Sequence, residues 1–343
     1  MKKTNVEATP VSLRRRFFRP HTVVALALAV AFLVFIFTRF EVSLSDTWRQ
    51  IRGSDPLYYV LGLAVYYASF PLRGLRWKIL LRNAGLDREG KGLPSIAALT
   101  QMLLLNWFAN VILYARVGDI YRPYLLKEER DIPYSASLGT VVAERVIDVL
   151  VVVGLLGVAA LVLLGGSTAN VALQFVMVGA GLVVLILAAL ALLWRFGGHL
   201  DRWMPARVRS AWWSFRKSTF SSFRQVPLPV VLSVAIWLME AARLYFVALA
   251  LDVHIALPFV FFVAMAYALL VAIPATPGGF GLVEPGMAGL LTLAIASASA
   301  WSVTFLDRSI SFLSLIVVGL VIFGWREVKR VVAARRSSPP VRD

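Results

Sequence analysis

Several of the longest apolar stretches in this sequence carry charged side chains well inside them. An ionised group in hydrocarbon is costly unless it is paired or hydrated, so such groups mark candidate functional sites. Side chains three or four residues apart share a helix face, which applies to Glu144 with Asp148 and to Glu240 with Arg243. The full set of candidates is Glu144, Arg145, Asp148, Glu240, Arg243, Glu284, Asp307 and Arg308.

These charges have two interpretations. In the first, they pair across helices and serve only to fix the packing. In the second, they surround a polar intramembrane cavity in which arginines donate bidentate hydrogen bonds to the phosphate of a lipid headgroup. The carboxylates would then orient the arginines and leave the cavity less than fully cationic.

Two further segments carry residues suited to binding. Arg116, Asp119 and Arg122 lie close together in a short segment. Either Arg116 and Arg122 hold a lipid phosphate at the cytoplasmic surface, or the segment is an ordinary basic interfacial loop. The segment from Pro277 to Gly281 cannot be helical throughout, and it offers backbone N–H groups before a helix N-terminus. We expect a turn or hinge there, built from Pro277, Gly278, Gly279, Gly281 and Glu284, although Glu284 has a simpler reading as a favourable first-turn acid.

The sequence lacks the usual signatures of enzymes and metal sites. It contains no His-Glu-x-x-His, Gly-x-Ser-x-Gly or Walker motif, and it has no cysteine. Its three histidines all lie at the ends of apolar segments, so they cannot form an intramembrane metal cluster or catalytic base. We therefore expect no catalytic residue, no metal and no cofactor.

The elements that would position these residues are membrane helices. The chain is 59% hydrophobic and only 16% charged, with a mean hydropathy of +0.76. Several apolar runs approach the ~20 residues that a helix needs to cross a bilayer. The net charge is +16, and the charged residues cluster between these runs, as the positive-inside rule expects. This distribution disfavours a nucleic-acid partner. The candidate segments are 22–38, 57–72 (continuing as polar sequence to about residue 82), 94–114, 134–164, 170–194, 228–250, 256–273, 282–297 and 299–325.

The ends of the chain are basic. Residues 1–21 are expected to be a cytoplasmic tail, and the run 22–38 a retained first helix rather than a cleaved signal peptide. A single membrane domain over 22–330 and a cytoplasmic tail over 331–343 complete the predicted organisation.

The charged flanks also fix the topology. The basic flanks 73–91, 195–224 and 326–336 are predicted to be cytoplasmic, whereas the loops 165–170 and 251–256 are expected to face outward. With these assignments, 94–114 must enter and leave on one face, so we predict a re-entrant segment. The region 256–297 must do the same from the outer face, either as a re-entrant hairpin, which we favour, or as two short spans. The prediction is an all-α, polytopic membrane helical bundle with an inverted-topology repeat and two re-entrant elements.

Three blocks of sequence resemble the lysylphosphatidylglycerol synthase transmembrane-region family: 115–126, 142–148 and 277–284. The resemblance extends over roughly residues 20–330 and implies the flippase-like half of that family, without the soluble aminoacyl-transferase domain that some members carry. One departure is Asp119, a shorter acid where the family often has Glu. Stand-alone members of the family are associated with varied lipids, so the resemblance does not supply the substrate.

We therefore expect a lipid translocase, not an enzyme, in a bacterial inner membrane, with both termini in the cytoplasm. The residues expected to bind the headgroup are Arg116, Asp119, Arg122, Glu144, Arg145, Asp148 and Arg308. The partner would be an anionic phospholipid, a polyprenyl-phosphate or a hopanoid-type lipid, with a separate lipid-modifying enzyme as a further candidate. Two alternatives are open: a membrane-embedded transferase acting on a polyprenyl-phosphate lipid, and a non-transporting scaffold for envelope assembly.

Overall fold

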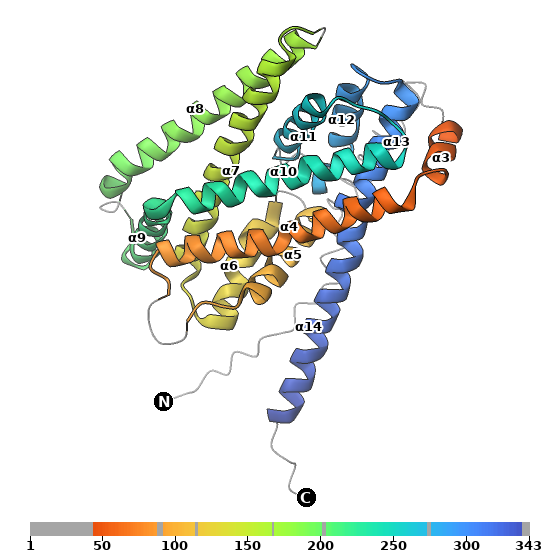
Figure 1. The fold of residues 1–343 in the computed structure, drawn as a ribbon. Coiled ribbons are helices and arrows are strands. Elements are labelled where there is room, and N and C mark those ends of the chain that lie inside the picture. Colours follow the sequence, from red (N-terminus) through yellow and green to blue (C-terminus); the bar gives the residue numbers. More distant parts are fainter. Residues whose placement is uncertain are drawn as a thin grey trace, which may run out of the picture. The chain divides into compact units, whose positions relative to one another are not determined.

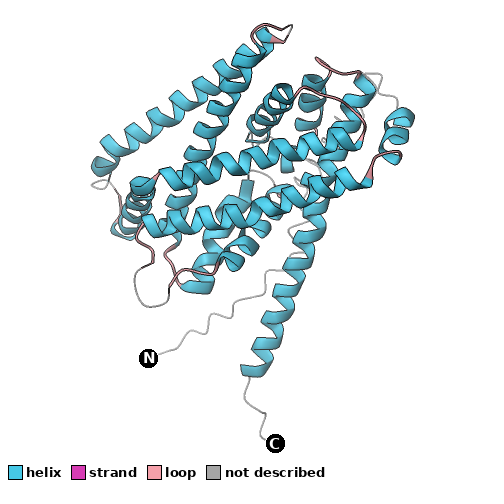
Figure 2. Ribbon diagram, viewed as in Figure 1, coloured by secondary structure: helices cyan, strands magenta, loops and turns pink. Residues whose placement is uncertain are grey.

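A computed structural model describes residues 44–87, 92–113, 116–166, 168–200, 204–272 and 276–337 of the chain. The predicted first helix at 22–38 lies outside these residues. The described part is helical, without a strand (Figure 2). The prediction of an all-α polytopic membrane protein is confirmed by the many apolar helices.

The helices that we expected from hydropathy are present (Figure 1), but the expected segment 282–297 is α-helical only as far as Leu291, and the expected segment 299–325 is divided into two α-helices. They are α4 (Pro56–Asn83), α5 (Ile96–Ile112), α7 (Tyr134–Leu163), α8 (Ala169–Leu200), α10 (Pro227–Ala250), α11 (Leu257–Ala272), α12 (Val283–Leu291), α13 (Ser297–Arg308) and α14 (Leu315–Ser337). A π-helical turn, Ser309–Ser314, joins α13 to α14. The structure adds α3 (Leu44–Arg52), α6 (Val117–Arg130) and α9 (Ala206–Ser221), and a 3-10 turn at Ser222–Gln225.

Within the described residues, four helical segments are long and apolar enough to cross a membrane: Tyr134–Leu163, Ala169–His199, Pro227–Ala250 and Ser297–Lys329. The segments of α5 and α11 are apolar but shorter. Helix α8 exposes apolar side chains along most of its length, Met177, Val184 and Leu192 among them, as a helix in contact with hydrocarbon would. The described residues thus contain both long and short apolar helices, as the re-entrant topology requires.

Helices α4 and α10 form the centre of the bundle and run antiparallel along their whole length (Figure 1). At one end, the Asn83 side chain donates to the Ser222 and Gln225 carbonyls, just before α10 begins. At the other end, the Asp55 amide donates to the Ala250 carbonyl over 2.7 Å. Because α4 and α10 are the first helices of the two predicted repeats, their antiparallel packing fits an inverted arrangement.

Each central helix is followed by a helical hairpin. In the first, the end of α5 meets the start of α6: the Gly118 amide donates to Asn110 Oδ1 over 2.8 Å, and its Cα lies against the Asn106 carbonyl. In the second, Gly286 of α12 packs against Leu270 of α11. Whether either hairpin re-enters the bilayer stays a prediction, because the structure contains no membrane.

Candidate functional site

The tips of the two hairpins meet in the interior of the bundle. Arg116, at the first tip, donates to the Val271 carbonyl at the end of α11, over 3.4 Å. Gly278, in the second tip, approaches Val111 of α5 so closely that a Cβ atom would lie 3.2 Å from the Val111 Cα. Two segments more than 150 residues apart in sequence therefore lie side by side.

Local sequence explains the shape of the second tip. Pro277 begins a 3-10 turn, and Gly278, Gly279 and Gly281 all have positive φ, at 58°, 74° and 84°. Such backbone favours glycine, because a Cβ atom is strained there. The Gly281 amide donates to Glu284 Oε2 over 2.6 Å, so Glu284 caps the turn from the first turn of α12.

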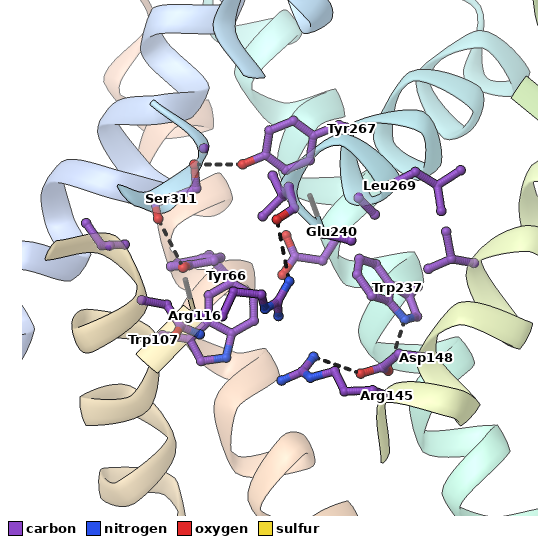
Figure 3. A pocket seen from close by; sticks show the side chains of 18 of the residues that line it. Tyr66, Trp107, Arg116, Arg145, Asp148, Trp237, Glu240, Tyr267, Leu269 and Ser311 are labelled. Atoms are coloured by element: carbon purple, nitrogen blue, oxygen red, sulfur yellow. Dashed lines mark hydrogen bonds and ion pairs between the residues drawn. The ribbon is translucent and has the colours of Figure 1, made fainter. Parts of the chain in front are cut away.

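A cavity of about 120 Å³ lies beside the two tips. Its wall contains five arginines and two carboxylates, so the charges lining it are predominantly positive. Aromatic side chains complete the wall, as Figure 3 shows for Tyr66, Trp107, Trp237 and Tyr267. The charged lining residues are Arg73, Arg116, Arg145, Arg243, Arg308, Asp148 and Glu240.

Behind the wall, the first repeat holds a cluster of ion pairs around α7. Arg76 of α4 is wholly buried and donates to Glu144 over 2.8 Å, to Asp148 over 2.5 Å and to the Ser233 hydroxyl over 2.6 Å. Glu144 and Asp148 share a helix face as expected, and Arg76 binds both of them. Trp237 of α10 adds a hydrogen bond to Asp148 (Figure 3).

The second repeat holds a matching cluster around α13. Arg243 of α10 lies 2.8 Å from Asp307 and 3.1 Å from Glu240, which confirms that Glu240 and Arg243 meet. Arg308 donates to Glu284 over 2.8 Å and to the Gly278 carbonyl over 2.9 Å. Arg73 of α4, a helix of the first repeat, also contributes to this second cluster, because its Nη2 lies 2.5 Å from Glu240.

The two clusters follow one pattern. An arginine of the first helix in each repeat pairs with an acid of the helix that follows the hairpin: Arg76 with Glu144 of α7, and Arg243 with Asp307 of α13. The next residue along α7 and α13 is in each case an arginine, and it pairs with the acid just after the hairpin tip. These second pairs are Arg145 with Asp119, at 3.1 Å, and Arg308 with Glu284, at 2.8 Å.

The candidate residues from the sequence lie in three places: on the cavity wall, at the first tip and behind the cavity. Arg116, Arg145, Arg308, Asp148, Gly278 and Gly279 line the cavity. Asp119 lies at the first tip, where its short side chain still reaches Arg116 and Arg145. Arg122 and Glu144 lie behind the cavity: Arg122 is wholly buried, stacks 4.9 Å from the Trp77 ring centroid and donates to Glu144 over 2.9 Å.

Sequence reasoning missed Arg73 and Arg76. We expected the region 73–91 to be a cytoplasmic basic flank, but α4 continues to Asn83 and both side chains are buried, at 3% and 0% exposure. The assignment was wrong for these two residues because the positive-inside rule applies to exposed loop charges, whereas these arginines have carboxylate partners inside the bundle. The cavity aromatics were also missed, since aromatic residues in apolar runs resemble ordinary core residues.

Comparison with known proteins identifies the family of this chain. Residues 22–319 match the model of the lysylphosphatidylglycerol synthase TM region. The chain belongs to this family. Among its relatives, a UPF0104 membrane protein of Methanocaldococcus jannaschii is 30% identical over 63% of this chain and 93% of the relative. A UPF0104 membrane protein of Methanothermobacter thermautotrophicus is 24% identical over 88% and 92%.

A further relative has a name that states an activity. "Glycosyltransferase AglD" of Haloferax volcanii is 28% identical over 90% of this chain. The match covers 55% of AglD, so this chain spans about half the length of that relative. The comparisons therefore place the chain among membrane proteins of one family, with one relative that is named as a glycosyltransferase.

Proposed function

We propose that this chain is a lipid translocase that binds a phosphate-bearing headgroup in the cavity between the two hairpin tips. The observation that carries the proposal is the cavity wall, in which five arginines face only two carboxylates. Guanidinium groups bind phosphate with paired, charge-assisted hydrogen bonds. The headgroup would lie among these arginines while the acyl chains stay in the bilayer.

The arrangement of the ion pairs supports movement rather than static binding. The pairs Arg145–Asp119 and Arg308–Glu284 connect α7 and α13, respectively, to a hairpin tip, and each arginine also lines the cavity. A phosphate that binds one of these arginines competes with its carboxylate partner. Headgroup binding would therefore weaken the ion pair that holds a hairpin tip. The tip could then move, and the lipid could pass from one side of the site to the other.

Reconstitution tests the proposal. Purified protein in liposomes, with a panel of lipids labelled on the headgroup, should accelerate the crossing of at least one phosphate-bearing lipid relative to protein-free vesicles. Arg145→Gln and Arg308→Gln should each weaken headgroup binding about tenfold or more, because each removes a charged donor. Arg82→Gln is the matched control, since this arginine is 61% exposed and is not among the residues that line the cavity.

A second candidate is a transferase acting on a polyprenyl-phosphate lipid, which the name of the relative AglD favours. Such an enzyme would also need arginines for the lipid phosphate. Incubation of the purified protein with polyprenyl-phosphate and a labelled nucleotide sugar distinguishes the two. Formation of a glycosylated lipid without any partner protein would support the transferase, whereas lipid crossing without product supports the translocase.

In the proposed role as a translocase, the chain is not an enzyme and acts in a bacterial inner membrane, with both termini cytoplasmic.

A further inference from the structure

One carboxylate of the buried network differs from the others. Asp307 is wholly buried, and among the described residues Arg243 is the side chain paired with its carboxylate, with Nη1 2.8 Å from Oδ1. No hydrogen-bond donor of the described residues is directed at Oδ2. An ionised carboxylate in such a place has few of the hydrogen bonds that normally offset its desolvation.

The other five carboxylates of the network are better satisfied. Asp148 accepts from Arg76, Arg145 and Trp237. Glu144 accepts from Arg76 and Arg122, and Glu284 accepts from Arg308 and a backbone amide. The remaining two are Glu240, held by Arg73 and Arg243, and Asp119, held by Arg116, Arg145 and Asn110. Among these six, Asp307 is the acid whose ionised form is least supported.

The elements around Asp307 carry several charged and titratable groups. Helix α10 contributes Glu240 and Arg243, α12 contributes Glu284, and Arg308 follows on α13 itself. Helix α4 presents Tyr66 and Arg73, and α11 presents Tyr267, near the π-helical turn. Helix α3 also packs against α13, but its Asp46 and Arg49 side chains are 50% and 81% exposed, so their charges lie at the surface.

Asp307 lies directly behind the cavity wall. Ser311 lines the cavity and donates from its hydroxyl to the Asp307 carbonyl over 3.1 Å. The Tyr267 hydroxyl, also on the wall, lies 3.5 Å from the Ser311 hydroxyl. These hydroxyl groups connect the cavity to the neighbourhood of the buried acid.

We propose that Asp307 is a proton-binding site whose protonation is coupled to the binding of an anionic lipid headgroup in the cavity. The inference rests on the proposed function and adds the coupling ion. A metal cation is a poor alternative, because Arg243 and Arg308 would repel it and oxygen ligands are not gathered around the carboxylate. A proton instead bonds to one carboxylate oxygen and removes the charge that has few hydrogen-bond donors around it.

Arg243 couples the two binding events. It is shared between Asp307 and Glu240, and it also lines the cavity. When Asp307 accepts a proton, one anionic partner of Arg243 is lost, so the wall becomes more positive and binds a phosphate more tightly. By linkage, a bound phosphate must favour the protonated acid to the same degree. A phosphodiester carrying one negative charge and one proton would then move together without net charge.

Binding measurements test the coupling. Trp107 and Trp237 line the cavity, so their fluorescence offers a direct readout of occupancy. The probe is dihexanoyl phosphatidylglycerol, because the charge of its phosphodiester stays constant across the pH range 5.5–8. We expect the Kd of the wild-type protein to fall as the pH falls, by at most about tenfold per pH unit for one linked proton. Asp307→Asn, which mimics the protonated acid, should bind at every pH as tightly as the wild type does at low pH.

Asp252→Asn is the matched control, because this side chain is 97% exposed in the loop between α10 and α11 and should leave the pH dependence intact. A wild-type Kd that does not change with pH, or an Asp307→Asn variant that retains the wild-type pH dependence, would overturn the inference while leaving headgroup binding in place. If neither phosphatidylglycerol nor the labelled lipids bind at any pH, the proposed function fails as well. In liposomes, an imposed pH gradient should drive uptake by the wild-type protein but not by Asp307→Asn.

Discussion

At the scale of single residues, Arg76 shows how the site is held together. Its guanidinium is wholly buried and reaches two acids of α7 and a hydroxyl of α10, so one side chain joins three helices. Breaking a buried ion pair by removing one partner is costly, because the other charge is left without compensation. Here two carboxylates would lose the same partner. Arg76 is therefore a positioning residue for Glu144 and Asp148.

We expect Arg76→Gln to lower the free energy of unfolding by about 3–5 kcal/mol. Arg82→Gln, six residues along the same helix, should cost no more than about 1 kcal/mol, because its pairing with Asp87 is exposed. Thermal unfolding in detergent, followed by circular dichroism, measures both. Equal effects of the two substitutions would contradict a structural role for the buried network.

The same network shows what the sequence could have revealed. The charges expected at membrane depth comprised five acids but only three arginines. Buried acids need partners, so this imbalance points to missing cations, which the structure identifies as Arg73 and Arg76. The arginines were assigned to a flank because they follow an apolar run, and the sequence alone does not show that α4 continues inside the bundle.

At the scale of the helices, the apolar segments were predictable because their length and hydropathy reflect the membrane itself. Helices α6 and α9 were not predicted, since they are short and polar and lie in regions that we interpreted as basic loops. Helix α6 forms through tertiary contact: its first turn, at Gly118, is fixed by Asn110 and by close approach to the Asn106 carbonyl. Such contacts cannot be predicted from the residues of α6 alone.

The packing of α6 on α5 gives a prediction for Gly118. A Cβ atom there would overlap the Asn106 carbonyl, and backbone cannot move aside as a flexible side chain would. We expect Gly118→Ala to lower the free energy of unfolding by about 1–3 kcal/mol through overpacking. Gly154→Ala is the control, because nothing lies within 4 Å of the added atom on α7 and alanine favours a helix. An unfolding midpoint of Gly118→Ala equal to that of the control would show that the first hairpin is not packed in this way.

The second tip depends on glycine for a different reason. Gly278 has a φ of 58°, and a Cβ atom would lie 2.6 Å from the Phe312 ring. Gly278→Ala should therefore displace the tip from the Gly278 carbonyl contact with Arg308, and weaken headgroup binding more than it lowers stability. Parallel measurements of binding and thermal unfolding check this expectation. Gly289→Ala, in α12 with open space around it, should leave both unchanged.

At the scale of the whole chain, the matching ion pairs are the strongest sign of two related halves. Each half has a central helix, a hairpin and a long helix, and corresponding positions carry an arginine paired with an acid. The charges differ in exposure: the Arg145 and Asp119 side chains are 29% and 17% exposed, whereas those of Arg308 and Glu284 are 9% and 3% exposed. In the proposed translocase, two halves in different conformations would produce an asymmetry of this kind.

If the halves are inverted, the two hairpins must open toward opposite faces of the membrane. The chain has no cysteine, so single cysteines can be introduced at will. We expect Ala97→Cys and Lys127→Cys, at the two ends of the first hairpin, to react with an impermeant thiol reagent from one side of the membrane. His254→Cys and Ala294→Cys, at the ends of the second, should react from the other side. All four positions are exposed, so a permeant reagent should label each of them and serves as the control. Labelling of Ala97→Cys and Lys127→Cys from opposite sides would mean that α5 crosses the bilayer, and the cavity would then not lie between two re-entrant tips.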